Sequence, residues 1–420
     1  MTGFKQTAIG TLLEDWEVRE IKDLVLDTET RNPQKEPTKK IKYVDVSSVS
    51  NQTFSVIGHQ DFLGKNAPGR ARKVVYTNDV IFATVRPTLK RIAKISQEYN
   101  GEYCSTAFCV LRADKNKLYF EFLYQYLLTN FFVKEIAKYQ SGASYPAVRD
   151  DDVKKTKMPY PPLNEQCNIA KILSIIQSAI ETQEKIIQTT TELKKALMQK
   201  LFTEGLKGEA QKETEIGLVP KSWEVVKVDD LGGIVTGTTP PTKKKEYYEN
   251  GRFQFISPVD LGETKHVYRT EKEISLEGLK VSRVLSKDSV LVVCIGSTTG
   301  KVGLTSQEKS TTNQQINAVI CSGDFNPHFI YYLLDFKKDY IRSLATPSPV
   351  PILTKGQFQK AVIPITRNRQ EQDEIAKRLS VLDEKIEYIT HKKKTLQGLF
   401  QSMLHHLMTG QIRVKDLRVS

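Results

Sequence analysis

The stretch KQTAIGTLLEDWEVREIKDL (5–24) returns without a gap as KETEIGLVPKSWEVVKVDDL (212–231). The only two tryptophans of the chain, Trp16 and Trp223, occupy the same place in the two copies. A self-similarity of this length is the signature of an internal repeat, which decides the fold before any single motif does.

A second match extends the repeat. NEQCNIAKILS (164–174) aligns with RQEQDEIAKRLS (369–380), so that Glu165 corresponds to Glu371 at an offset of 371 − 165 = 206 residues. The tryptophan pair gives nearly the same offset, 223 − 16 = 207. The chain is therefore one unit written twice.

Composition bounds the class of protein. A chain of 420 residues is too long for one ordinary core and predicts two to four structural units. We see no apolar run of membrane-spanning length and no signal peptide at the start, and the five scattered cysteines fit a reducing compartment. We expect a cytoplasmic globular protein.

The charge points to a class of partner. Lys and Arg number 62 against 49 Asp and Glu, a formal net charge of +13. Such a surplus favours a polyanion, because cations placed on phosphates release condensed counterions. The charge alone leaves nucleic-acid binding and a merely basic protein equally open.

Each copy opens with a mixed region. The apolar runs at 73–85 and 284–296 are rich in Val and Ile, are broken by Asn-Asp or Lys-Asp turns, and predict the same strands in both copies. Apolar spacing near 3.6 residues predicts one helix at 121–139 and another at 328–344.

Each copy closes with a long helix. Apolar residues recur at alternating spacings of four and three, which is a heptad seam. Asn164 is the expected first cap, and Gly205 and Gly410 end the two helices. The seam residues are Ile169, Leu173, Ile176, Ile180, Ile187, Leu197 and Leu201 in the first helix, and Ile375, Leu379, Leu382, Ile386, Ile389, Leu396, Phe400, Met403 and Leu407 in the second.

These parts predict an α+β architecture. Two mixed α/β domains in tandem are separated by two long helices, which form an antiparallel intramolecular coiled coil with pseudo-two-fold symmetry. The expected boundaries are 1–160 for the first domain, 161–205 for the first helix, 206–366 for the second domain, and 367–420 for the second helix and a C-terminal tail.

Several motifs together carry a family resemblance. They are the paired T-x-I-G…W-E-V openings, PYPPLNEQ (159–166) at the start of the first long helix, and GTTPPTKKKEYY (237–248). In this order they make the chain resemble the specificity subunit of type I restriction–modification enzymes over nearly its whole length.

The resemblance implies a function. Each mixed region would be a target recognition domain that reads one half of a bipartite site in double-stranded DNA. The helices would set the spacing and dock two modification subunits that methylate adenine. Whether a restriction subunit, a translocase and nuclease, also joins is left open.

The residues indicate no chemistry of the chain's own. A methyltransferase needs Asp or Asn before Pro-Pro-aromatic, which is missing, and GSTTGKVG (296–303) lacks the spacing of a phosphate loop and predicts a strand, a turn and a strand. Cys104 and Cys109 have no further ligands at zinc spacing. We expect no catalytic residue, no cofactor and no metal.

DNA contacts are expected on loops that a rigid scaffold holds, where Arg suits guanine, amides suit adenine and Lys suits phosphates. Candidates in the first domain are Arg70, Arg72, Lys73, Arg86, Lys90, Arg91 and Tyr145. Candidates in the second domain are Lys243, Lys244, Lys245, Thr298, Lys301, Asn313, Gln314 and Gln315. The stretches 141–145 and 346–350 hold equivalent places and are either contact loops or plain turns.

Two rival functions stay open from the sequence. One is a fused methyltransferase or nuclease, which the missing motifs argue against. The other is a coiled-coil scaffold whose domains bind protein rather than DNA.

Overall fold

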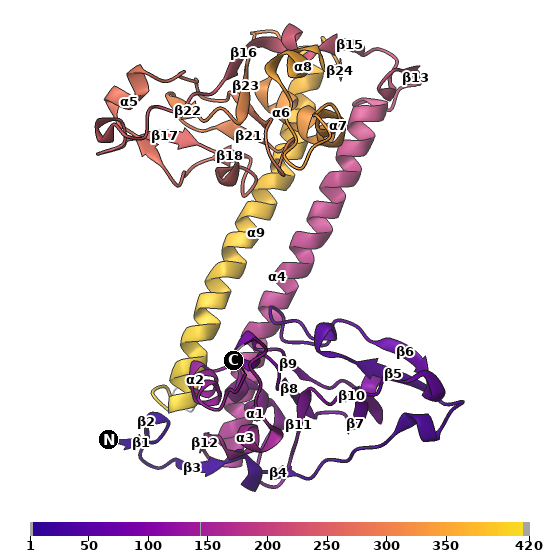
Figure 1. Cartoon of the computed structure of the whole chain (residues 1–420), viewed down its shortest axis with the longest axis vertical. Coiled ribbons are helices and arrows are strands. Elements are labelled where there is room, and N and C mark those ends of the chain that lie inside the picture. Colours follow the sequence, from indigo (N-terminus) through magenta and orange to yellow (C-terminus); the bar gives the residue numbers. More distant parts are fainter. Residues whose placement is uncertain (1–2, 143, 415–420) are drawn as a thin grey trace. The chain divides into compact units, whose positions relative to one another are not determined.

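The computed structural model in Figure 1 describes residues 3–142 and 144–414, so the end of the expected C-terminal tail lies outside the described residues. Two units divide the chain: unit 1 joins Met1–Gln183 to Lys392–Ser420, and unit 2 is Glu184–His391. In the described ranges no helix is long and apolar enough to cross a membrane.

The repeated openings form the same structure in both units. Each makes a hairpin whose turn holds a glycine at positive φ, Gly10 at 109° and Gly217 at 96°. Trp16 and Trp223 follow and are completely buried. The strands are β1 (Phe4–Thr7) with β2 (Gly10–Leu13), and β13 (Gln211–Thr214) with β14 (Gly217–Pro220). The next strand of each copy pairs with the last one: β3 (Glu17–Glu20) with β12 (Lys157–Tyr160), and β15 (Glu224–Lys227) with β24 (Val362–Ile365).

Unit 1 contains two four-stranded sheets. The first has the order β4 (Val25–Leu26), β11 (Phe108–Ala113), β8 (Val80–Ala83) and β9 (Ile92–Lys94). The second has the order β6 (Gln60–Leu63), β5 (Lys40–Val44), β10 (Glu102–Ser105) and β7 (Ala71–Val75). Within the second sheet β10 runs parallel to β5.

Unit 2 repeats this plan with small changes. Its first sheet has the order β16 (Gly232–Thr236), β23 (Ile316–Cys321), β20 (Val290–Val293), β21 (Val302–Thr305) and β18 (His266–Val267). Its second sheet has the order β19 (Glu273–Ile274), β17 (Phe253–Ile256) and β22 (Ser310–Thr312), with β17 parallel to β22.

The runs 73–85 and 284–296 do supply equivalent strands. Each sends its last strand, β8 or β20, antiparallel to β11 or β23, with Ala83 opposite Phe108 and Val293 opposite Ile316. The polar turn before each strand also matches, because Asn78 and Asp288 both adopt positive φ, 72° and 60°. The expected turns are thus confirmed.

One helix was expected after these strands in each copy, and that expectation is wrong. The structure has two helices in each place: α1 (Phe120–Leu127) and α2 (Asn130–Ala137) in unit 1, and α6 (Pro327–Phe336) and α7 (Lys338–Ser343) in unit 2. In unit 1 the break has a clear cause: the Thr129 hydroxyl accepts a hydrogen bond from Phe132 N (3.2 Å) and donates one to Tyr126 O (2.7 Å). A new helix therefore begins. Shorter helices are α3 (Asp150–Lys155), α5 (Leu276–Lys280) and α8 (Lys355–Lys360).

The long helices are α4 (Leu163–Glu204) and α9 (Arg369–Thr409), and glycines at φ 71° and 73°, Gly205 and Gly410, follow their ends. All sixteen seam residues are buried or half-buried. In unit 1 the start of α4, with Leu173, shares a core with Leu407 near the end of α9. In unit 2 the end of α4, with Leu201, shares a core with Leu379 near the start of α9. The helices therefore pack antiparallel (Figure 1).

A buried glutamine ties each long helix to its domain. The Gln166 side chain is completely buried, and its amide nitrogen donates to Pro161 O (2.9 Å) and Lys117 O (3.2 Å). Its amide oxygen accepts from Tyr119 N (2.9 Å). The same three bonds recur for Gln372 with Thr366, Asp324 and Asn326. The repeated Glu-Gln pair therefore marks the place where each helix docks on its sheet domain.

Candidate nucleic-acid interface

Three segments of unit 1 meet where β8 ends, and we call them edge 1. They are residues 84–91, 105–107 and 141–147. Backbone hydrogen bonds join them: Thr84 N donates to Ala107 O (2.8 Å), and Arg86 N donates to Pro146 O (2.7 Å). Ala143 lies outside the described residues. Edge 1 is thus a set of loops held on the end of a buried strand.

Unit 2 builds the same arrangement, which we call edge 2, where β20 ends. Its segments are residues 294–301, 313–315 and 346–352. Cys294 N donates to Gln315 O (2.7 Å), and Gly296 N donates to Pro351 O (2.9 Å). The bonds match those of edge 1 one for one. Because the strand, the turn and the loop are equivalent, the stretches 141–145 and 346–350 occupy the same position in the two units.

Edge 1 presents a cation and an aromatic ring together. Arg86 is exposed and holds a left-handed backbone conformation, φ 49°. Its guanidinium carbon lies 5.0 Å from the centre of the Tyr145 ring, which is 70% exposed. Arg70, also exposed, accepts a backbone bond from Thr106 in the neighbouring turn (2.9 Å). A guanidinium held by an aromatic face is suited to phosphates and base edges.

Other expected contacts of unit 1 are used inside the domain. Lys73 is 14% exposed, donates to Phe108 O (2.6 Å) and forms an ion pair with Asp150. Arg91 donates to the carbonyls of Val46 (3.1 Å) and Val49 (2.5 Å).

Lys90 and Arg72 are also engaged. The Lys90 ammonium donates to Leu128 O and to Asn130 Oδ1, both at 3.2 Å, and burial lowers its pKa. The Arg72 guanidinium, half-buried, donates to Ala71 O (3.0 Å). Among the expected residues of unit 1, Arg70, Arg86 and Tyr145 are therefore those that face solvent.

Edge 2 presents amides and hydroxyls instead of a cation. Gln314 is exposed, and its carbonyl oxygen accepts from the Thr239 hydroxyl (2.6 Å). Asn313 and Gln315 are half-buried and hold each other, because the Asn313 amide donates to Gln315 Oε1 (2.9 Å). Thr298 is exposed in the turn between β20 and β21.

The turn of GSTTGKVG joins the antiparallel strands β20 and β21, which confirms the expected strand, turn and strand. No helix follows the turn to receive a phosphate, since β21 begins at Val302. Lys301 is half-buried and donates to Pro258 O (3.3 Å), so it braces the neighbouring loop.

The run GTTPPTKKKEYY lies beside edge 2. Thr238 N donates to Thr312 O (2.9 Å), and a Cβ at Gly237 would come within 2.1 Å of Asn313 O. Only glycine permits that approach, which explains why the run begins with it. Lys243, Lys244 and Lys245 are exposed, and the Lys244 ammonium donates to Tyr247 OH (3.2 Å).

One exposed cation was missed from the sequence. The Arg283 guanidinium donates to Thr236 O (2.7 Å), directly before the run at 237–248. Some forty-seven residues separate the two in the chain (283 − 236 = 47), so no local pattern joined them. Only the fold shows that this arginine lies beside edge 2.

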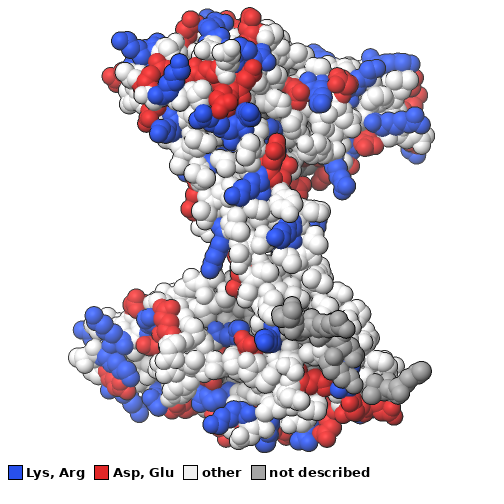
Figure 2. Space-filling view, turned by 180° about the vertical axis from the view of Figure 1, so that it is seen from behind, with Lys and Arg blue, Asp and Glu red and all other residues white. Residues whose placement is uncertain are grey.

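The surface charge is mixed. On the face drawn in Figure 2, basic and acidic side chains are interspersed over both units. Although the whole chain has a net charge of +13, the basic side chains on that face do not form one continuous field. Local side chains at the edges, rather than overall charge, must therefore carry any selectivity.

Cys104 and Cys109 are buried, and burial raises the pKa of both thiols.

Known proteins share this organisation. A family model described as "Type I restriction modification DNA specificity domain" matches residues 13–192 and again 220–397. A Methanocaldococcus jannaschii protein, assigned as the specificity subunit of type I restriction enzyme MjaX, is 29% identical over 98% of this chain and 97% of its own length. The HindI specificity subunit of Haemophilus influenzae is 24% identical over 83% of this chain and 89% of its own length.

Solved structures have the same fold. One, from work on complex assembly and conformational transition of the type I R-M system, is 25% identical with a TM-score of 0.55, covering 96% of this chain and 99% of the other. The S subunit of a type I restriction-modification system from M. genitalium has a TM-score of 0.63 at 16% identity, covering 94% and 96%.

Proposed function

The chain belongs to the family of type I restriction–modification DNA specificity proteins, and on that premise we propose that each of its two units reads one half of a bipartite DNA site. One observation supports this above the others: edge 1 and edge 2 share the same backbone hydrogen bonds but present different side chains. A common scaffold with different contact groups is what two unlike half-sites require.

The two edges would read different chemistry. At edge 1, Arg86 and Arg70 suit guanine or phosphate oxygens, and Tyr145 keeps the Arg86 guanidinium in place. At edge 2, Gln314 can offer an amide to adenine, while Lys243 and its neighbours suit the phosphate backbone. The half-sites should therefore differ in sequence.

The long helices would dock the modification subunits. Exposed apolar side chains occur at equivalent places of α4 and α9, Ile175 with Val381 and Leu193 with Leu399, each pair 206 residues apart. Single exposed apolar side chains are common on protein surfaces, but their recurrence at equivalent places of both helices favours a protein partner. Because the two members of each pair hold equivalent places in the repeat, we propose two copies of an adenine-methylating subunit, one docked on α4 at Ile175 and the other on α9 at Val381.

We assign no chemistry to the chain itself. In this proposal its recognition domains are residues 1–160 and 206–366, residues 161–205 are the first spacer helix, and residues 367–420 are the second spacer helix and a C-terminal tail. Methyl transfer belongs to the modification subunits, and a restriction subunit is a further candidate partner. The chain would act in the cytoplasm, where its free cysteines stay reduced.

A gel shift with the modification subunits present tests the proposal. We expect Arg86→Ala combined with Tyr145→Ala to weaken binding to the cognate site at least about tenfold, as loss of a specific base contact does. Lys115→Ala is the matched control, because Lys115 is exposed in the same unit but follows β11 at the strand end away from edge 1.

The rival, a scaffold with protein-binding domains, predicts the opposite. It requires that the complex bind no DNA duplex specifically, or that the edge variant and the Lys115 control behave alike. Either result would remove DNA reading from edge 1.

A further inference from the structure

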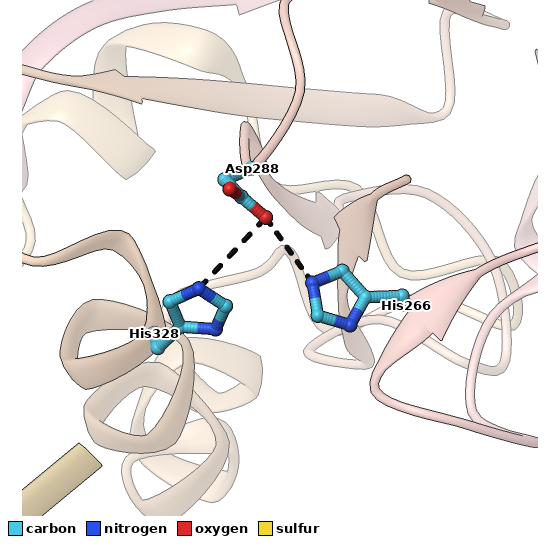
Figure 3. A group of neighbouring side chains, drawn as sticks. All are labelled: His266, Asp288 and His328. Atoms are coloured by element: carbon cyan, nitrogen blue, oxygen red, sulfur yellow. Dashed lines mark hydrogen bonds and ion pairs between the residues drawn. The ribbon is translucent and has the colours of Figure 1, made fainter. Parts of the chain in front are cut away.

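Two histidines and an aspartate converge in unit 2, away from the strand ends that form edge 2. His266 lies on β18, Asp288 in the turn before β20, and His328 in the first turn of α6. His266 Nε2 is 3.1 Å from Asp288 Oδ1, and His328 Nε2 is 3.9 Å from the same oxygen. Figure 3 shows both rings facing that carboxylate. One ligand atom from each residue lies within 4.8 Å of the others.

Ordinary hydrogen bonding does not account for the group. His266 and Asp288 form a normal hydrogen bond, but 3.9 Å is too long for a second one from His328. The other ring nitrogen of His328, Nδ1, is buried and has no hydrogen-bond partner among the described residues. The half-buried His328 ring thus has one nitrogen buried without a partner among the described residues, and its Nε2 has only the longer contact with Asp288, which calls for an explanation.

We propose that His266 Nε2, His328 Nε2 and Asp288 Oδ1 bind one divalent transition-metal ion of the zinc type, with water completing a tetrahedron. A tetrahedral zinc with bonds of about 2.1 Å sets its ligand atoms about 3.4 Å apart. The two distances to Asp288, 3.1 and 3.9 Å, lie on either side of that value. Small side-chain rotations would therefore complete the site.

The surroundings agree with this ligand set. Burial lowers the pKa of both histidines, which favours the neutral imidazole that binds metals. Asp288 holds φ 60°, a conformation that Asp and Asn tolerate better than other residues with a side chain. The positive charges of Lys265 and Lys287 lower the pKa of His328, whereas the negative charge of Asp288 raises it. The two lysines would also repel a metal cation and so moderate the affinity of the site for it.

Such an ion would brace unit 2. β18 is only two residues long, lies at the edge of its sheet, and pairs with β21 at two positions. The ion would join β18 to α6 and to the turn before β20. Lys265, next to His266, donates to Ser380 Oγ of α9 (2.8 Å), so the braced strand also carries a contact with the long helix.

Sequence reasoning found no metal site because the ligands are 22 and 40 residues apart (288 − 266 and 328 − 288). No short spacing joins them. Binding of the ion is independent of DNA reading, since none of the three residues belongs to edge 2.

The test is zinc titration of the full, tag-free chain after chelator treatment, in competition with a chromophoric chelator. We expect one zinc per chain at this site, and loss of it in His266→Gln, His328→Gln and Asp288→Asn. The loss should exceed the roughly 10- to 100-fold that removal of an outer-shell partner causes. His59→Gln is the matched control, because His59 also faces carboxylates, Asp61 at 3.6 Å and Glu98 at 3.7 Å, and should keep the site.

Two measurements on the unaltered chain guard against a variant that fails to fold. Cobalt in place of zinc should give the intense visible absorption of a four-coordinate ion, and zinc should slow amide hydrogen exchange around β18. The proposal is overturned if cobalt keeps its weak six-coordinate spectrum, if exchange at β18 is unchanged, or if the three ligand variants bind zinc as the unaltered chain does.

Discussion

The helix pair can be tested as a ruler by lengthening both helices by one heptad. Lys194 pairs with Asp383 at 2.6 Å, so in the antiparallel pair Ile187, seven residues earlier, lies opposite the region of Ile389. An ideal heptad inserted after Ile187 and another after Ile389 keeps the seam in phase. Both helices then grow together.

The expected change follows from helix and duplex geometry. Seven residues add about 10.5 Å at about 1.5 Å per residue. At about 3.4 Å per base pair this equals about three base pairs between half-sites. Three pairs turn the duplex by about 100°, at about 10.5 pairs per turn. Over about 10.5 Å, a coiled coil with a supercoil pitch of about 150 Å rotates by only about 25°. This rotation is left-handed, opposite to that of the duplex, so it does not compensate.

The measurement is the affinity of the lengthened chain, with the modification subunits present, for a series of duplexes that differ in the number of base pairs between the half-sites. We expect either a preferred spacer about three pairs longer, or loss of tight bipartite binding because the half-sites no longer face both edges. The control replaces residues 181–187 by the same ideal heptad without lengthening. Unchanged spacer preference and affinity in the lengthened chain would refute the reasoning, and would leave the helices a docking role alone.

Three further predictions concern stability, docking and activity. Gln166→Leu should lower the free energy of unfolding of unit 1 by about 2–4 kcal/mol, because it leaves the Tyr119 N–H and two backbone carbonyls without their hydrogen-bond partner. Denaturant titration measures this change, and Lys171→Ala, at an exposed position of the same helix, is the control. Ile175→Glu should prevent binding of one modification subunit and Val381→Glu binding of the other, which native mass spectrometry of the complex measures. If the double variant still bound two modification subunits, these residues would not be the docking sites. The chain alone, given S-adenosylmethionine and DNA, should transfer no methyl group in a radiolabel assay, and transfer above background would contradict the assignment of chemistry to its partners.

Much of the fold could be predicted because the repeat doubles every local signal. The tryptophans, the Glu-Gln pairs and the terminal glycines each occur twice, so their burial and position in the structure follow from a pattern seen in two copies. The break between α6 and α7, at Lys337, could not be predicted, and neither could the break between α1 and α2, where the apolar spacing of 121–139 continues through Thr129. There a single side-chain hydrogen bond overrides periodicity.

The interface was harder to predict for a physical reason. Residue type told us that Lys73 and Arg91 are cations, but only the fold shows that their charges meet Asp150 and backbone carbonyls. Conversely, Arg283 approaches edge 2 through a contact of long sequence separation. Side-chain partners decide which cations are free, and those partners come from elsewhere in the chain.

The central claim is tested most directly by a domain exchange, in which residues 1–160 are replaced by the same region of a relative. The hybrid is made in a host that also makes the modification subunits, and the methylated adenines of that host are mapped. If each unit reads its own half-site, one half of the methylated motif changes, and the other half and its adenine stay as they were. A change in both halves, or in neither, would contradict independent reading by the two units.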